Sequence, residues 1–313
     1  MATQISFIIP HMGREELLDQ TIASITSLDF DLTAIEVIVV TKNQEISSNL
    51  KAFEKTLSIQ FLHSKSDKTI SYQRNMGAQA ASGEIFCFLD ADIGLSPDWL
   101  KVMLNELDKD KNRKIVSASQ KASEKPSPLE LLRVKLSNAV LDQNVEFLPG
   151  RNLVMLKETF YEVEGFPEHL ITCEDYYFTQ KVAELGTLYY SSATWYVHLG
   201  EDKEFIPMAK KEVWRGLSNF KSIKGRRIPF SEWPSFIAPL IITFGLLGAI
   251  PFYFADLGII ANTFVFSALV VFLSYCVRLR RLTGGKPGFL TILTFYSLYF
   301  PARTWGTIKG ILN

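Results

Sequence analysis

Short apolar runs alternate with longer amphipathic stretches along the first ninety residues of the chain. The runs are rich in β-branched and aromatic residues and predict strands at 5–10, 35–40, 59–62 and 85–89. Between them, apolar residues recur at helical spacing and predict helices over 15–28, 49–57 and 71–81. Strands that alternate with helices are typical of a parallel sheet with right-handed crossovers. The pattern therefore predicts an α/β fold, a mostly parallel sheet flanked by helices.

The fourth predicted strand has the most informative ending. Ile85–Leu89 is apolar throughout, as in a strand buried on both faces, and it runs directly into Asp90 and Asp92. Ligands of open α/β sheets bind at the carboxyl ends of the strands, and alternate residues of an extended segment share a face. Two such carboxylates repel each other unless a cation or a proton lies between them. We therefore expect a site for a divalent metal and a diphosphate; the alternative is an ordinary strand-end turn.

The rest of the first 209 residues continues the mixed pattern. Pro10 cannot continue a central ladder, so the first strand is expected to close there. Gly77 and neighbouring alanines predict a helix that packs closely on the sheet. Further helices are predicted at 97–107, 127–141, 157–163 and 176–185, and further strands at 115–118, 188–190 and 195–198.

The remaining chain has a different composition. Residues 236–255 and 257–277 contain no charge, and 20 residues already suffice to cross a hydrocarbon core of about 30 Å. A soluble domain of this size is too small to bury two such helices, so we expect a transmembrane hairpin. A third apolar segment, 288–302, fits a tilted span, a re-entrant segment or an interfacial helix.

Charge divides the chain at the same place. The 33 basic and 33 acidic residues balance overall, but residues 1–209 carry a net charge of −10 and residues 210–313 one of +10. A basic, apolar tail indicates membrane lipids as a partner rather than nucleic acid. Basic residues before the first span and after the second, with none between them, place both ends of the hairpin in the cytoplasm.

The order of these motifs resembles the family 2 glycosyltransferases, which have the Rossmann-like GT-A fold. The resemblance covers about residues 5–220. It rests on the strand ending at Pro10, Arg74-Asn75, Gly83-Glu84 before the Asp90-Ala91-Asp92 strand, Gly165-Phe166, Glu174-Asp175 and His198. It implies transfer of a sugar from a nucleotide-sugar with inversion and with Mg²⁺ or Mn²⁺. The implied domains are a nucleotide-sugar-binding half at 1–105, an acceptor-binding half at 106–220 and a membrane anchor at 221–313.

The resemblance also implies roles for single residues. Pro10, Arg74, Asp90 and Arg215 would contact the nucleotide-sugar, Asp92 and His198 the metal. Asp175 would be the general base on the acceptor hydroxyl, supported by Glu174. The alternatives are a surface position for Arg74, helix capping by Glu174 and Asp175, a structural role for His198, and a lipid-facing collar for the basic residues 210–227. The family often has an acid after the second strand; this chain has Val40-Thr41-Lys42-Asn43, so the resemblance assigns no residue there to the nucleotide base.

These observations predict a membrane-anchored, metal-dependent glycosyltransferase that faces the cytoplasm and acts on a hydroxyl acceptor, such as the sugar of a lipid-linked glycan. A polyprenyl-phosphate glycosyltransferase is the alternative enzyme; its acceptor phosphate needs no general base, so Asp175 argues against it. A non-catalytic nucleotide-sugar-binding subunit of a membrane complex is the alternative outside enzymes. A processive synthase is disfavoured, because the tail has too few clear spans for a translocation channel.

Overall fold

The structure is a computed structural model that describes residues 4–223, 228 and 230–312. It divides into two compact units: one comprises the chain up to Ser123 together with Val140–Glu201, the other Glu124–Ala139 together with the chain from Asp202 on. Each unit is described by itself below. The boundaries expected near residues 105 and 220 stay predictions.

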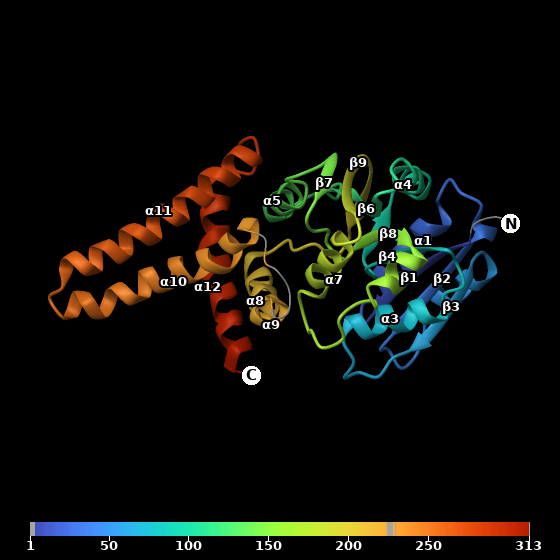
Figure 1. Cartoon of the computed structure of the whole chain (residues 1–313), viewed down its shortest axis with the longest axis horizontal. Coiled ribbons are helices and arrows are strands. Elements are labelled where there is room, and N and C mark those ends of the chain that lie inside the picture. Colours follow the sequence, from blue (N-terminus) through green and yellow to red (C-terminus); the bar gives the residue numbers. More distant parts are fainter. Residues whose placement is uncertain (1–3, 224–227, 229, 313) are drawn as a thin grey trace. The chain divides into compact units, whose positions relative to one another are not determined.

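The first unit is a sheet with helices on both faces (Figure 1). Its strands are β1 (Ile5–His11), β2 (Ile35–Thr41), β3 (Ser58–His63), β4 (Ile85–Leu89), β5 (Ile93–Leu95), β6 (Arg113–Lys121), β7 (Gln143–Val145), β8 (Asn152–Leu156) and β9 (Thr187–His198). Its α-helices are α1 (Glu15–Thr26), α2 (Ser48–Ala52), α3 (Ile70–Ala80), α4 (Trp99–Asp108), α6 (Lys157–Glu162) and α7 (Glu174–Ala183), with 3₁₀ turns at Leu32–Ala34 and Phe53–Lys55.

The strand order is β3-β2-β1-β4-β8-β6-β9-β5, and β7 also pairs with β9. The first four strands are parallel, as the alternating pattern predicts. Beyond β4 the sheet is mixed, because β8 runs antiparallel to β4 and β6, and β5 and β7 run antiparallel to β9. This is a GT-A-like mixed sheet flanked by helices, and the predicted fold class is confirmed.

Alternation along the strands divides the apolar residues between two cores. Phe7, Ile9 and Cys87 face α1 and α4, whereas Ile8, Phe86 and Phe88 face the other side, where α3, α6 and α7 pack. Gly77 of α3 lies so near β1 that a methyl group there would come within 2.6 Å of Ile8 Cγ2. The expected close packing of this helix is confirmed.

The expectation that β1 closes at Pro10 is wrong, because the strand continues to His11 and pairs with β2 throughout. The carbonyl of His11 accepts a hydrogen bond from Lys42 N on the β2 side. Backbone groups of neighbouring residues point to opposite sides of a strand, so the nitrogen of Pro10 faces β4. Pairing with β4 ends at Ile8, and the missing N–H therefore costs no ladder bond.

Several other expected elements have different bounds. The strands predicted at 188–190 and 195–198 form one strand, β9, which pairs with β6 through an irregularity near Ala118. The helix expected at 97–107 begins at Trp99, so Pro97 precedes it. The short strand β5 and the strand β7 were not predicted, since three residues carry too little pattern.

The second unit is helical in its described part. It contains α5 (Pro128–Ser137), α8 (Phe205–Gly216), α9 (Asn219–Ile223), a 3₁₀ turn at Phe230–Glu232, α10 (Trp233–Phe254), α11 (Gly258–Leu282) and α12 (Phe289–Leu312). The expected helix 127–141 is therefore shorter than predicted, and the third apolar segment belongs to a longer, continuous helix. Gly306 and Gly310 of α12 approach the backbone of α8 and the adjoining Leu217 so closely that a methyl group on either would overlap it.

Two buried carboxylates connect the helices of the second unit. Glu212 pairs with Arg215 of its own helix, with Arg133 of α5 and with Arg303 of α12. Asp202 lies 2.6 Å from Lys211 Nζ and 3.6 Å from Arg133 Nε. Arg303 therefore belongs to an ion-pair cluster between helices.

Candidate functional site

Asp90 and Asp92 follow β4 at its carboxyl end, as predicted. The Asp90 backbone N–H donates to Arg151 O at 3.1 Å, which holds the start of this turn against the chain leading into β8. The Asp90 side chain is 30% exposed and that of Asp92 11%. The first carboxylate is thus accessible to a ligand, while the second lies deeper.

The register of β5 on β9 brings His198 to Asp92. Ile93, the residue after Asp92, pairs with His198, and Leu199 N donates to Asp92 O at 2.8 Å. His198 Nε2 consequently lies 3.3 Å from Asp92 Oδ1. On its other oxygen, Asp92 accepts a hydrogen bond from Arg14 Nη2 at 3.0 Å.

The electrostatics of this pair follow from its neighbours. Burial would raise the pKa of Asp92, but His198 and Arg14 outweigh it and hold the pKa below its ordinary value. Burial likewise lowers the pKa of His198, but its hydrogen bonds to Asp92 and Glu201 more than compensate and raise it. Asp92 is therefore an ionised carboxylate beside an imidazole ring.

Arg74 is buried rather than on the surface of its helix. Its side chain is 2% exposed and lies over the Phe166 ring, with Cζ 4.9 Å from the ring centroid. One guanidinium nitrogen donates to Asp90 Oδ1 at 2.9 Å, and another donates to Glu174 Oε1 at 2.9 Å. The Arg74 guanidinium therefore connects the strand-end carboxylates with the Glu174-Asp175 pair, across 100 residues of sequence.

Glu174 and Asp175 lie in the first turn of α7, which begins two residues earlier than predicted. The position before the helix is Cys173, whose φ of 64° is in the left-handed region. Asp175 Oδ2 accepts a hydrogen bond from Gly150 N at 3.2 Å, and Oδ1 accepts one from Tyr176 N at 2.8 Å. Asp175 thus contacts its helix terminus and is also held toward the loop that contains Gly150.

Burial, followed by the negative charge of Asp175, raises the pKa of Glu174 to about 7, although Arg74 opposes the shift. A buried carboxyl group with a raised pKa thus lies beside a second, half-buried one. Such an arrangement is common where proton transfer takes place.

The donor set is compatible with a divalent metal. Asp92 supplies an oxygen ligand, and His198 supplies a nitrogen ligand if its second nitrogen carries the proton, as the Glu201 contact at 3.0 Å favours. Among the described residues, no three His, Cys, Asp or Glu side chains form a group that could hold a metal by itself. The remaining ligands would have to be phosphate oxygens and water, which is how Mg²⁺ is commonly held at phosphate sites.

The other predicted site residues are in different surroundings. Pro10 lies inside β1, and Arg215 belongs to the second unit, where it pairs with Glu212 and lies near Asp202. Sequence reasoning did not find Arg14, Gln120, Arg151 and Glu201. Arg14 follows the carboxyl end of β1, and Glu201 follows His198 by three residues; position after a strand end was the available signal.

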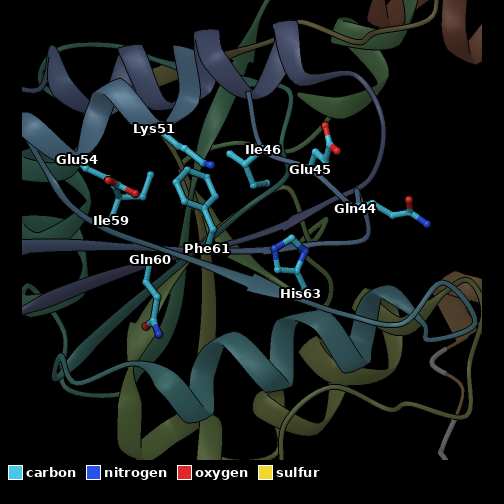
Figure 2. Close-up of a pocket in the computed structure, with 9 residues that line it drawn as sticks. All are labelled: Gln44, Glu45, Ile46, Lys51, Glu54, Ile59, Gln60, Phe61 and His63. Atoms are coloured by element: carbon cyan, nitrogen blue, oxygen red, sulfur yellow. The ribbon is translucent and has the colours of Figure 1, made fainter. Parts of the chain in front are cut away.

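A separate pocket lies along the edge strand β3 and has a volume of about 530 Å³ (Figure 2). Phe61 and Ile46 lie on the side of β3 that faces α2, with Lys51 above them, whereas Gln60 points to the opposite side. β1 and β2 separate β3 from β4, and none of the predicted site residues lines this pocket.

Solved structures of glycosyltransferases share this fold. The mannosyltransferase PcManGT from Pyrobaculum calidifontis, in complex with GDP-Man and Mn²⁺, is 17% identical, with a TM-score of 0.65 over 98% of this chain and 88% of its own. TarS 1–349 from S. aureus, in complex with UDP-GlcNAc, is 16% identical, with a TM-score of 0.53 over 96% of this chain and 90% of its own.

No curated protein sequence matches this chain significantly. The model of glycosyl transferase family 2, by contrast, matches residues 6–163, about half of the chain, including β1, Arg74 and the Asp90-Ala91-Asp92 strand end. The chain therefore belongs to glycosyl transferase family 2.

Proposed function

We propose that this protein is a membrane-anchored, metal-dependent, inverting glycosyltransferase that transfers a sugar from a nucleotide-sugar to a hydroxyl group. The observation that carries the proposal is the pairing of two carboxylate groups through Arg74. Asp90 and Asp92 form one group, and Glu174 and Asp175 form the other. The Arg74 guanidinium donates one hydrogen bond of 2.9 Å to Asp90 and another of 2.9 Å to Glu174.

The first group suits the donor. Asp90 is accessible enough to accept a hydrogen bond from the nucleotide, and Arg14, with a side chain 61% exposed, supplies positive charge beside Asp92. Asp92 and His198 would hold the metal. When bound, a divalent metal supplies Lewis-acid stabilisation of the negative charge that develops on the departing diphosphate. PcManGT was solved with GDP-Man and Mn²⁺, and TarS with UDP-GlcNAc, which supports a nucleotide-sugar and Mn²⁺ here.

The second group suits the acceptor. An acceptor hydroxyl must lose its proton as it attacks the anomeric carbon, and one positioned carboxylate suffices. Asp175 is partly exposed and oriented by Gly150 N and Tyr176 N, whereas Glu174 is tied to Arg74. We assign the proton transfer to Asp175 and the support of its position and charge to Glu174. A single base, without a nucleophilic partner, corresponds to one-step inversion.

The tail supports membrane anchoring. Among the described residues, α10 and α11 are the helices long and apolar enough to cross a membrane. Only 28% and 17% of their most apolar windows are buried, so they do not resemble core helices of a soluble protein. Their exposed aromatic and aliphatic side chains, such as Phe244, Ile250 and Phe266, would face lipid. We infer an anchor that places the enzyme beside a lipid-linked acceptor.

The test is a screen of nucleotide-sugars with the purified full chain. We expect at least one UDP- or GDP-sugar to bind and to be slowly hydrolysed only when Mg²⁺ or Mn²⁺ is present. Binding without any metal-dependent hydrolysis or transfer would point instead to a non-catalytic nucleotide-sugar-binding subunit. No metal-dependent binding of any nucleotide-sugar would overturn the proposal.

Replacing the proposed base distinguishes the two acceptor classes. Asp175→Asn should lower turnover by about 10²-fold or more while donor affinity stays nearly unchanged, since an amide cannot accept the proton. A lipid phosphate is already ionised and needs no base, so the same change would then cost little. Transfer is measured with donor concentration varied, and Asp108→Asn, a change at an exposed position on α4, serves as the control. Near-normal turnover in a folded Asp175→Asn protein would favour a polyprenyl-phosphate acceptor.

A further inference from the structure

Beyond the residues already assigned, one buried carboxylate lies directly behind the proposed metal ligands. Glu201 Oε2 is 3.0 Å from His198 Nδ1, on the far side of the imidazole ring from Asp92. The two residues are also joined by a backbone hydrogen bond from Glu201 N to His198 O at 3.2 Å. The chain thus turns back at the end of β9 and brings an acid against the histidine.

Glu201 is itself held by a residue of β6 and by the residue that precedes β8, both in the same unit. Its side chain is 2% exposed, and the same Oε2 accepts a hydrogen bond from Gln120 Nε2 at 2.9 Å. Arg151 Nη1 lies 3.6 Å from this oxygen and donates to Gln120 Oε1 at 2.8 Å. Gln120 belongs to β6, and Arg151 directly precedes β8. The carboxylate is therefore fixed by a buried network.

This contact bears on which ring nitrogen could bind a metal. A neutral imidazole has one N–H donor and one acceptor nitrogen, and a carboxylate only accepts. Both ring nitrogens lie near a carboxylate, Nδ1 3.0 Å from Glu201 and Nε2 3.3 Å from Asp92. With a cation held by Asp92, the shorter Glu201 contact would keep hydrogen on Nδ1 and leave the lone pair of Nε2 for the cation. Gly200 preserves the approach, because a methyl group there would overlap Asp92 Oδ2.

We propose that Glu201 is a positioning residue for the metal site: it holds the Nδ1–H tautomer of His198, so that Nε2 and Asp92 present their lone pairs to one cation. The inference rests on the proposed function, since it concerns the metal of that reaction. Gln120 and Arg151 would in turn hold the Glu201 carboxylate in position. If Glu201 only stabilises the turn after β9, its loss would change unfolding but neither the tautomer nor the metal affinity.

The first test is Mn²⁺ binding without turnover. Free Mn²⁺ is followed by electron paramagnetic resonance as the full chain is added, with UDP or GDP present, whichever binds the wild type with metal. Glu201→Ala should weaken metal binding by about 10- to 100-fold, the usual effect of losing such a partner. Glu201→Gln keeps an oxygen that can accept from Gln120 Nε2 and His198 Nδ1, and it should lie closer to the wild type. Glu204→Ala, at an exposed position nearby, should change nothing.

The second test needs no variant at Glu201. Nitrogen-15 spectra of the histidine rings report which nitrogen carries hydrogen; the chain has 4 histidines, and the signals lost in His198→Gln identify His198. With Mg²⁺ and the nucleotide bound, at a pH where this ring is neutral, we expect hydrogen on Nδ1. The opposite tautomer, or equal Mn²⁺ affinity in wild type and Glu201→Ala, would overturn this inference and leave the proposed function standing. Absence of metal-dependent nucleotide binding in the wild type would overturn both.

Discussion

At the scale of single residues, the strand-end carboxylates have different partners, and we therefore expect different tasks for them. Asp90 is joined to Arg74, and Asp92 to Arg14 and His198. We expect Asp92→Asn, which keeps the shape of the side chain but removes its charge, to abolish the metal dependence of nucleotide-sugar binding. Turnover should fall by at least about 100-fold, because stabilisation of the leaving diphosphate is lost. Normal metal-stimulated turnover in this variant would show that Asp92 is only a strand-end residue.

The buried Glu174 gives the folded protein a pH dependence. Its pKa is raised to about 7 from an ordinary value of 4.5, first by burial and then by Asp175. At pH values between the two, the folded protein holds a proton on Glu174 that the unfolded chain releases. The free energy of unfolding therefore falls as the pH rises toward about 7.

A comparison with Glu174→Gln isolates this effect. The glutamine variant does not titrate at this position, so it lacks this loss of stability. The difference in free energy of unfolding, variant minus wild type, should therefore increase between pH 5 and pH 8. Urea unfolding of both proteins, at matched pH and in the same detergent, measures the difference. If the two pH profiles run parallel, Glu174 does not titrate with a raised pKa.

Residue identity was predictable where the signal is local. Asp90 and Asp92 were found because an apolar run ends beside them, and Glu174 and Asp175 through the resemblance to the family. The partners of Arg74 were not, since Glu174 lies 100 residues away and burial depends on how α3, α7 and the Gly150 loop meet. Glu201 was not predicted either, because its burial also depends on tertiary packing. An acid in a loop is ordinarily a solvated residue.

At the scale of elements, the first four strands and their helices were predictable, and the mixed half of the sheet was not. Period and length identify a strand, but they do not say whether its neighbour is parallel. The runs at 188–190 and 195–198 form the single strand β9 because β6 pairs with β9 along most of the length of β9. In addition, β7 pairs with the first part of β9 and β5 with its last part. The small residues 191–194 between the runs had suggested a break.

The approach of α3 to the sheet gives a prediction at this scale. Gly77→Ala should lower the free energy of unfolding by about 1–3 kcal/mol, because the new methyl group would come within 2.6 Å of Ile8 Cγ2 and 3.2 Å of Val40 Cγ2. Gly94→Ala is the control: its methyl group would meet Leu199 Cδ2 at 3.5 Å, an ordinary contact. Thermal unfolding of the wild type, Gly77→Ala and Gly94→Ala measures the difference. Equal destabilisation by both changes would mean that α3 has room to move away.

At the scale of the whole molecule, charge and apolar length argue for one topology. Arg278, Arg280 and Arg281 lie in the last turns of α11, and Lys221 lies in α9. The other basic residues before the first span, Lys224, Arg226 and Arg227, lie outside the described residues. Between the helices, the exposed Asp256 occupies the turn with a φ of 55°. Positive residues favour the cytoplasmic side, and loops without them cross readily.

We therefore predict that α10 and α11 cross the membrane as a hairpin, with Asp256 on the outer side. The first unit, which contains the candidate site, would then lie in the cytoplasm, where the nucleotide-sugar would be supplied. A single cysteine at position 256, in a variant that lacks Cys87, Cys173 and Cys276, tests this topology. A membrane-impermeant maleimide should label it in intact cells, whereas a cysteine at Lys221 should react only after permeabilisation. The reverse pattern would invert the hairpin. Labelling of both positions only after permeabilisation would mean that α10 and α11 do not cross, and would remove the anchor from the proposed function.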